Sequence, residues 1–68
     1  MERTKIRYEY EEGKFAFAYA ELESYQSEAG YFMIADNDYV WIFDKKDGEY
    51  GHTILGSQIV KIYKKRGG

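Results

Sequence analysis

The chain contains neither cysteine nor proline in its 68 residues. Without cysteine it forms no disulfide bond and no thiolate metal site, and this absence fits a reducing cytoplasm. Without proline, no strand ladder is interrupted by a missing N–H group. A chain of this length buries only about 60% of its unfolded surface, so its stability must come from few, large side chains.

Long apolar runs are missing as well. No stretch approaches the roughly 18 consecutive apolar residues that span a bilayer, and no signal peptide is visible. We therefore expect a soluble, cytoplasmic protein that does not contact membranes.

The net charge of −2 argues against a dedicated polyanion binder, but the charge is unevenly spread. Pairing of the two terminal strands would give the molecule a basic edge and an acidic lobe. Basic residues gather near both ends and acidic residues fill the early middle: Arg3, Lys5, Arg7, Lys61, Lys64, Lys65 and Arg66 against Glu9, Glu11, Glu12, Glu21, Glu23 and Glu28.

Aromatic residues are abundant, at 19% of the chain with eight tyrosines, and they mark the first predicted hairpin. Ile6, Tyr8 and Tyr10 alternate with charged residues, which is the two-residue period of a half-buried strand. Gly13 then supplies a turn. Beyond it, large rings alternate with alanines over residues 15–20, which predicts a strand at 14–23 and suggests that another layer approaches closely over the alanines. A helix over about 15–29 is the alternative, because the same stretch also fits a helical stripe and is rich in helix formers.

The remaining segments predict further short strands. Residues 31–35 and 39–43 form a second hairpin around "DND", and we expect 31–35 to be the most buried strand. "DKKDGE" and "LGSQ" are turns that lead into strands at 50–55 and 59–65. The prediction is an all-β fold, a small barrel of five to six strands, with α+β as the alternative. Residues 1–68 then form one small domain with a flexible basic tail at 65–68.

The pattern resembles the Src homology 3 (SH3) family. "IRYEYEE" resembles the opening strand of that family, with Tyr8 and Tyr10 at its tyrosine positions, and Trp41 matches the first tryptophan of its third strand. "TILGSQIVKI" resembles the segment where a single helical turn leads into the last strand. The resemblance implies an SH3-like barrel. Gly56 and Ile59 replace the proline and tyrosine that help hold polyproline ligands in the family, so a Pro-x-x-Pro peptide is not the expected partner.

Catalytic and metal-binding patterns are not found. His52 is the only histidine and has no cysteine beside it, so we interpret it as structural. The aspartates from Asp36 to Asp47 fit turns and not a calcium loop, because a strand separates them. No nucleophile, base and carboxylate have the spacing of a triad. We therefore predict no enzyme, no metal and no cofactor.

The aromatic surface is the main functional indication. A core this small cannot enclose every ring together with the isoleucines and valines. We predict that Val40, Ile42, Phe32, Ile34, Val60 and Ile62 point inward and that Tyr31, Tyr39, Trp41, Phe43 and Tyr63 point outward. The alternative is the inverted assignment, in which the aromatic rings form the core. An exposed aromatic patch is typical of an interface, where Trp and Tyr serve as anchors. The predicted partner-binding residues are Tyr39, Trp41, Phe43, Tyr31, Tyr63, Tyr8 and Tyr10.

Three functions follow as hypotheses. The first is a non-catalytic module that binds a protein partner or a second copy of itself through the aromatic patch, with Trp41 as central anchor. The second is single-stranded nucleic-acid binding, in which rings stack on bases and cations follow phosphates. Its site is the set Tyr8, Trp41, Tyr63, Arg7, Lys61, Lys64 and Lys65. The third is a small acidic inhibitor that occupies a nucleic-acid groove of an enzyme.

Overall fold

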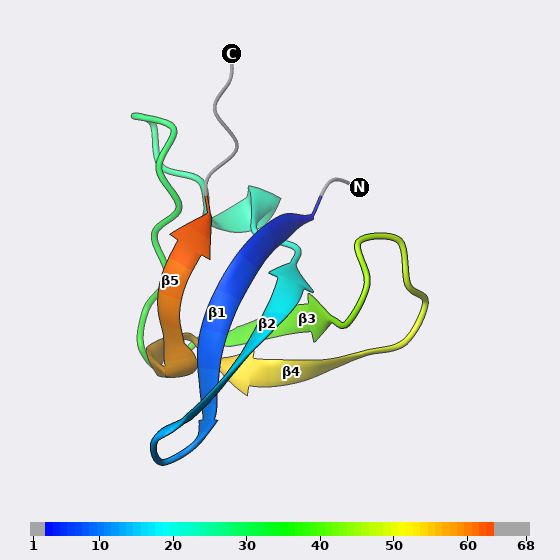
Figure 1. The fold of residues 1–68 in the computed structure, drawn as a ribbon. Helices are drawn as coiled ribbons and strands as arrows, with labels where there is room; N and C mark the ends of the chain where they lie inside the picture. The colour runs from blue at the N-terminus through cyan, green and yellow to red at the C-terminus, as the bar shows by residue number, and fades with distance from the viewer. Residues whose placement is uncertain (1–2, 64–68) are drawn as a thin grey trace.

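The computed structural model describes residues 3–63, which fold as antiparallel strands joined by turns and two single-turn 3₁₀ helices (Figure 1). The elements in chain order are β1 (Thr4–Glu11), β2 (Lys14–Ala20), η1 (Glu23–Tyr25), β3 (Tyr39–Phe43), β4 (Gly51–Leu55), η2 (Gly56–Gln58) and β5 (Ile59–Tyr63). The all-β prediction is confirmed. The tail predicted at 65–68 lies outside the described residues.

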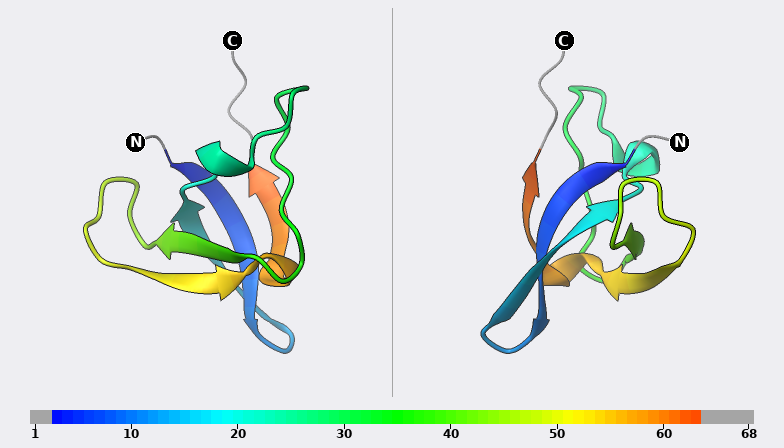
Figure 2. Two further views of the ribbon diagram at one scale, coloured as in Figure 1. Left: turned by 180° about the vertical axis from the view of Figure 1, so that it is seen from behind. Right: turned by 45° about the vertical axis from the view of Figure 1, so that its right-hand side comes forward.

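The five strands form one sheet in the order β4-β3-β2-β1-β5. The two terminal strands therefore pair, as the basic-edge hypothesis requires, and β2 lies in the middle of the sheet. β1 and β5 stand side by side, whereas β3 and β4 run across them (Figures 1 and 2). The sheet is thus strongly curled, with its two edge strands brought toward each other and η2 between them.

The core lies inside this curl and is lined by the small face of β2. Ala18 and Ala20 are fully buried, and the large side chains of the neighbouring strands meet over them. The buried cluster draws on four strands and the segment after β2, and partly buried residues of β5 pack against it. Its members are Ile6, Tyr8, Ala18, Ala20, Leu22, Val40, Ile42 and Ile54. The predicted close approach of a layer over the alanines is confirmed.

The helix considered for residues 15–29 is not formed. Residues 14–20 are strand β2, and only the three residues of η1 are helical in the segment that follows. β2 pairs with β1 from Ala20 opposite Thr4 to Lys14 opposite Glu11. The turn between them contains Gly13 at φ +76°, a left-handed conformation that glycine adopts without a Cβ penalty. Backbone pairing with β1 requires residues 14–20 to be extended, so the strand forms instead of the helix.

The prediction of a buried strand at 31–35 is wrong. This stretch makes one isolated bridge, between Phe32 and Gln26, and is otherwise irregular. Phe32 and Ile34 are half-buried and pack against the core, whereas Tyr31 and Met33 are exposed. The backbone of residues 31–35 is hydrogen-bonded to η1, since the Met33 N–H donates to the Tyr25 carbonyl at 2.8 Å. The apolar run here reflects the packing of two side chains and not a strand ladder.

One predicted side-chain direction, that of Val60, and the predicted exposure of Phe43 are also wrong. Val60, expected to point inward, is about half exposed because the pairing of β1 and β5 shifts between Arg7 and Tyr8. The shift places Ile59 opposite Tyr8, and a slip of one residue turns the next side chain to the other face. Phe43, expected to point outward, is only 8% exposed.

Phe43 is buried on the outer face of the sheet by two neighbours. The guanidinium of Arg3 lies 3.4 Å from the centroid of the Phe43 ring. Gly51 on β4 is the cross-strand partner of Phe43. Arg3 also donates a hydrogen bond to the Gly48 carbonyl at 2.7 Å and forms an ion pair with Glu21 at 3.5 Å. Its side chain, 13% exposed, therefore ties the start of β1 to the β3–β4 loop.

We predict that Gly51→Ala destabilises the fold by about 1–3 kcal/mol, since overpacking of a filled site has that cost. An added Cβ would lie 2.5 Å from Cε2 of Phe43 and 2.6 Å from the Ile42 carbonyl oxygen. Gly48→Ala is the matched control, because its Cβ would meet nothing closer than 3.4 Å. Urea unfolding should show the loss for Gly51→Ala alone. Equal stability of the two variants would show that Phe43 is not held against Gly51.

We also predict that Arg3→Lys destabilises the fold by about 1–3 kcal/mol, because an ammonium group cannot replace a planar guanidinium that stacks and donates at once. Arg7→Lys, at an exposed arginine of β1 four residues further along the chain, should change stability by less than about 0.5 kcal/mol. Chemical denaturation of both variants provides the comparison. A tolerated Arg3→Lys would mean that charge alone holds the β3–β4 loop.

Candidate functional site

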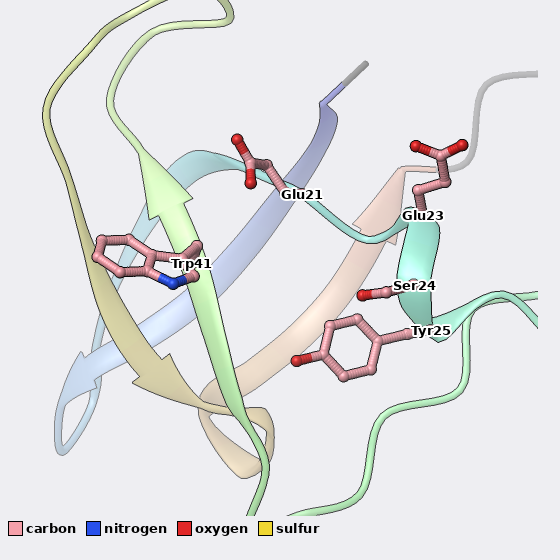
Figure 3. Close-up of a pocket in the computed structure, with 5 residues that line it drawn as sticks. All are labelled: Glu21, Glu23, Ser24, Tyr25 and Trp41. Carbon is pink, nitrogen blue, oxygen red and sulfur yellow. The ribbon is translucent and has the colours of Figure 1, made fainter. Parts of the chain in front are cut away.

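A hollow in the described surface lies beside Trp41. It has a volume of about 320 Å³, at the lower end of the range of small-ligand and side-chain pockets. Trp41 on β3 forms one wall, and Ser24 and Tyr25 of η1 lie across from it (Figure 3). Glu21 and Glu23 complete the lining.

Trp41 is held rigidly although its side chain is 53% exposed. Its backbone carbonyl accepts a hydrogen bond from Glu21 N–H at 3.3 Å, and Thr53 of β4 is its cross-strand partner. Its ring stacks beside that of Phe43, at 6.4 Å between centroids and 22° between planes. Because Arg3 and Gly51 fix Phe43, the indole has a firm support on one side and solvent on the other.

Tyr25 forms the opposite wall and is fixed from both ends. Its phenol donates a hydrogen bond to the Tyr39 carbonyl at 2.7 Å, so its ring is directed toward β3 (Figure 3). Its backbone N–H donates to the carbonyl of the fully buried Leu22 at 2.9 Å. Leu22 thus anchors η1 to the core and places Tyr25 across from Trp41.

The chemistry of the hollow is aromatic and acidic. Glu21 is partly neutralised by Arg3, whereas Glu23 is exposed on η1 and has no ion pair among residues 3–63. The described lining contains a serine hydroxyl and two carboxylates but no histidine or lysine. This set of groups can receive an apolar or positively charged side chain between two fixed rings.

A second surface lies on the outer face of β1, β2 and β5, which we call the basic aromatic face. It consists of Lys5, Arg7, Phe15, Phe17, Lys61 and Tyr63. Each of its cations lies over at least one of its rings. The guanidinium of Arg7 is 4.8 Å from the Phe15 centroid, and the Lys5 ammonium is 4.7 Å from that of Phe17. Lys61 covers Tyr63 at 4.9 Å.

The predicted partner-binding residues do not form one patch. Tyr39 and Trp41 are exposed on β3, but Phe43 beside them is covered by Arg3. Tyr63 belongs to the basic aromatic face, where its ring is 5.9 Å from that of Phe17.

The other three predicted residues lie elsewhere. Tyr8 is buried inside the curl, because the outer face of β1 carries the charged residues. Tyr10, at the end of β1, is about half exposed, and its ring is 6.3 Å from that of Tyr8. Tyr31 is exposed in the irregular segment before β3.

Seven residues of these surfaces were not predicted as binding residues, namely Lys5, Phe15, Phe17, Glu21, Glu23, Ser24 and Tyr25. Phe15 and Phe17 lie on the face of β2 that points away from the alanines. The alternation of rings and alanines in the sequence already implied that they lie outside. Tyr25 and Glu23 come from η1, whose position depends on the burial of Leu22. Nothing in the local sequence indicates that η1 lies beside Trp41.

Other candidate groups remain scattered. Within the described part of the chain, no three His, Cys, Asp or Glu side chains come together as a metal site requires. His52 is exposed on β4, opposite Ile42. Asp36 and Asp38 offer their backbone carbonyls to the N–H groups of Ser57 and Gly56, which fastens the loop before β3 to η2.

Within residues 3–63, no helix has the length and apolar character needed to cross a bilayer. Comparisons of the chain with protein-family models, with curated proteins and with solved structures found no match in any of the three. The functional argument therefore depends on the two surfaces themselves.

Burial raises the pKa of the Tyr8 phenol above its usual value near 10, and the negative charges of Asp44 and Tyr10 act in the same direction. In the unfolded chain the phenol ionises near pH 10. Below that pH both states keep the proton, and the contribution of Tyr8 to stability is fully present. Above it the unfolded state loses the proton first, so the free energy of unfolding falls as pH rises.

We predict that Tyr8→Phe reduces this alkaline loss. Between about pH 9 and pH 11, urea midpoints of Tyr8→Phe should fall less than those of the wild type, because phenylalanine has no proton to release. Tyr50→Phe is the matched control, since Tyr50 is exposed on the β3–β4 loop, and it should keep the wild-type slope. A wild-type slope in Tyr8→Phe would show that Tyr8 does not contribute to the pH dependence.

Proposed function

We propose that the protein is a non-catalytic module with an SH3-like small β-barrel, and that it binds a protein partner at the surface around Trp41. The sheet order supports the barrel, because β5 returns to pair with β1 at the far edge from β4. η2 between β4 and β5 is the single helical turn that the resemblance implies. Gln58 in that turn donates to the Glu9 carbonyl at 3.2 Å and so joins the turn to the end of β1.

One observation carries the proposed site: a half-exposed tryptophan is held rigid beside a hollow whose far wall is a fixed tyrosine. Interface energy concentrates in such anchors, because a large ring that is already ordered loses little entropy on binding. Tyr39, 68% exposed on the same strand, extends the aromatic surface. Glu23 sets the orientation of the partner by favouring a positive group at that end.

The partner in this proposal is a protein segment that inserts a side chain between Trp41 and Tyr25. A second copy of the chain is the alternative occupant, and the two differ in a simple observable. Self-association makes the average molecular mass in solution depend on protein concentration. A module that binds a different protein stays monomeric in the absence of that protein.

We predict that Trp41→Ala lowers affinity for the partner at least about 30-fold, which corresponds to the loss of a hot spot of about 2 kcal/mol. The partner is captured by pull-down, purified, and titrated by calorimetry. Because Trp41 is half exposed, the variant should stay folded, with a melting temperature within a few degrees of the wild type. Tyr50→Ala, an exposed ring on the β3–β4 loop, is the matched control.

Glu23→Lys gives a second and independent measurement. It reverses the free charge beside the hollow without removing a buried side chain. We expect weaker binding with unchanged stability. The proposal fails if Trp41→Ala and Tyr50→Ala bind the partner equally well, or if Trp41→Ala unfolds and Glu23→Lys binds like the wild type.

A further inference from the structure

We infer that the basic aromatic face is a second site, separate from the Trp41 hollow, and that it binds single-stranded nucleic acid. The inference goes beyond the proposed protein-binding function and uses different residues. Of the nucleic-acid set expected from the sequence, the structure brings together Arg7, Lys61 and Tyr63. Tyr8 is buried, Trp41 lies at the hollow, and Lys64 and Lys65 lie outside the described residues.

The first argument is an unfavourable pair of charges. Arg7 of β1 and Lys61 of β5 are direct cross-strand partners, and Lys5 lies two residues from Arg7 on the same face. Like charges placed directly opposite each other destabilise a sheet. A polyanion that lies across both strands converts this repulsion into attraction.

The second argument is that these cations have no carboxylate partners within the described part of the chain. Among residues 3–63 the ion pairs are Arg3 with Glu21 and Lys14 with Glu11, and neither involves the basic aromatic face. The nearest acidic residue in the ladder, Glu9, accepts a hydrogen bond from the Gly13 N–H at 2.9 Å. Its carboxylate is thus directed to the turn at the end of the hairpin. The face keeps a local positive charge although the chain as a whole carries −2.

The third argument is the exposure and spacing of the rings. Phe17 is 56% exposed and Phe15 is 41% exposed, and both lie on one side of β2. Side chains two residues apart on a strand are about 6.6 Å apart, which leaves room for one base beside each ring. Base stacking on aromatic side chains, with cations along the phosphates, is the usual mode of single-strand binding.

These features favour single-stranded nucleic acid over other anions. A duplex hides its base faces, so it could use the cations of the face but not its rings. An acidic peptide pairs with the cations but offers nothing to stack on Phe15 and Phe17. A single strand can use every residue of the basic aromatic face, because its bases stack on the rings and its phosphates contact the cations.

The test measures anisotropy of a fluorescent oligothymidine of about 12 nucleotides, within the site size of small barrels. The wild type should bind it more tightly than a duplex of equal length, with affinity falling steeply as salt rises. Phe17→Ala should weaken binding about 5- to 150-fold, the range expected for the loss of one stacked base. Lys61→Glu should weaken binding and lower the log–log salt slope by about 0.7 or more, the value for one phosphate contact with a single strand.

Lys61→Glu also gives a readout that a merely structural role would not produce. It places a carboxylate opposite Arg7, so the melting temperature should stay the same or rise while binding is lost. Lys46→Glu, which makes the same charge change on the β3–β4 loop, is the matched control and should bind nearly as the wild type does. Trp41→Ala should also leave oligonucleotide binding unchanged, which separates this site from the proposed protein site.

Three results would overturn the inference. The first is no binding of the oligonucleotide at low salt. The second is an equal loss of affinity in Lys46→Glu and Lys61→Glu, which would show that only overall charge matters. The third is tighter binding to an acidic peptide, or to vesicles of anionic lipid, than to the oligonucleotide.

Discussion

The small inner face of β2 is the constraint on which the rest of this structure depends. β2 is the middle strand of five, and its inner side chains are alanines, of which Ala18 and Ala20 are fully buried. Because these side chains are short, the strands on either side curl over them and bring Ile6, Val40 and Ile42 into one cluster. A larger residue at Ala18 or Ala20 would hold the two halves of the sheet apart. The chain has no disulfide or thiolate metal site to compensate, so close packing of a small core must supply its stability.

The same constraint places aromatic rings outside. A strand alternates its faces, so an alanine row inside requires that Phe15, Phe17 and Tyr19 lie on the outer side. The outward rings of the sheet differ in how far they are exposed. The fold covers Phe43 with Arg3, which makes that ring structural, and it leaves Trp41 and Phe17 more than half exposed. The covered ring in turn supports the exposed indole of Trp41, so part of the stability of the outer face serves to hold the hollow in shape.

Where the sequence predicted the structure correctly, the decisive interactions were local. Alternation and a turn glycine were enough for the β1–β2 hairpin, because its two strands are neighbours in the chain. The errors arose where a residue distant in the sequence determines the burial or the direction of a side chain. The burial of Phe43 depends on Arg3, forty residues earlier in the chain, and the direction of Val60 depends on a shift in its pairing with β1. The position of Tyr25 opposite Trp41 depends on Leu22 entering the core. Local patterns carry no information on such contacts, so only the anchor Trp41, and not the hollow around it, could be predicted.

The two candidate surfaces differ in sign, and Arg3 explains how so small a molecule keeps them distinct. Arg3 forms an ion pair with Glu21, which lines the hollow, and donates hydrogen bonds to the carbonyls of the β3–β4 loop. It therefore adds little positive potential to either surface. Among residues 3–63, Glu23 has no ion pair at the hollow, and Lys5, Arg7 and Lys61 have no carboxylate partner on the other face. If Arg3 were instead unpaired, its field would reach both surfaces, because the screening length of about 8 Å at physiological salt is comparable to the width of two strands. An arginine that is paired for structural reasons thus allows an acidic and a basic candidate surface to coexist on one small sheet.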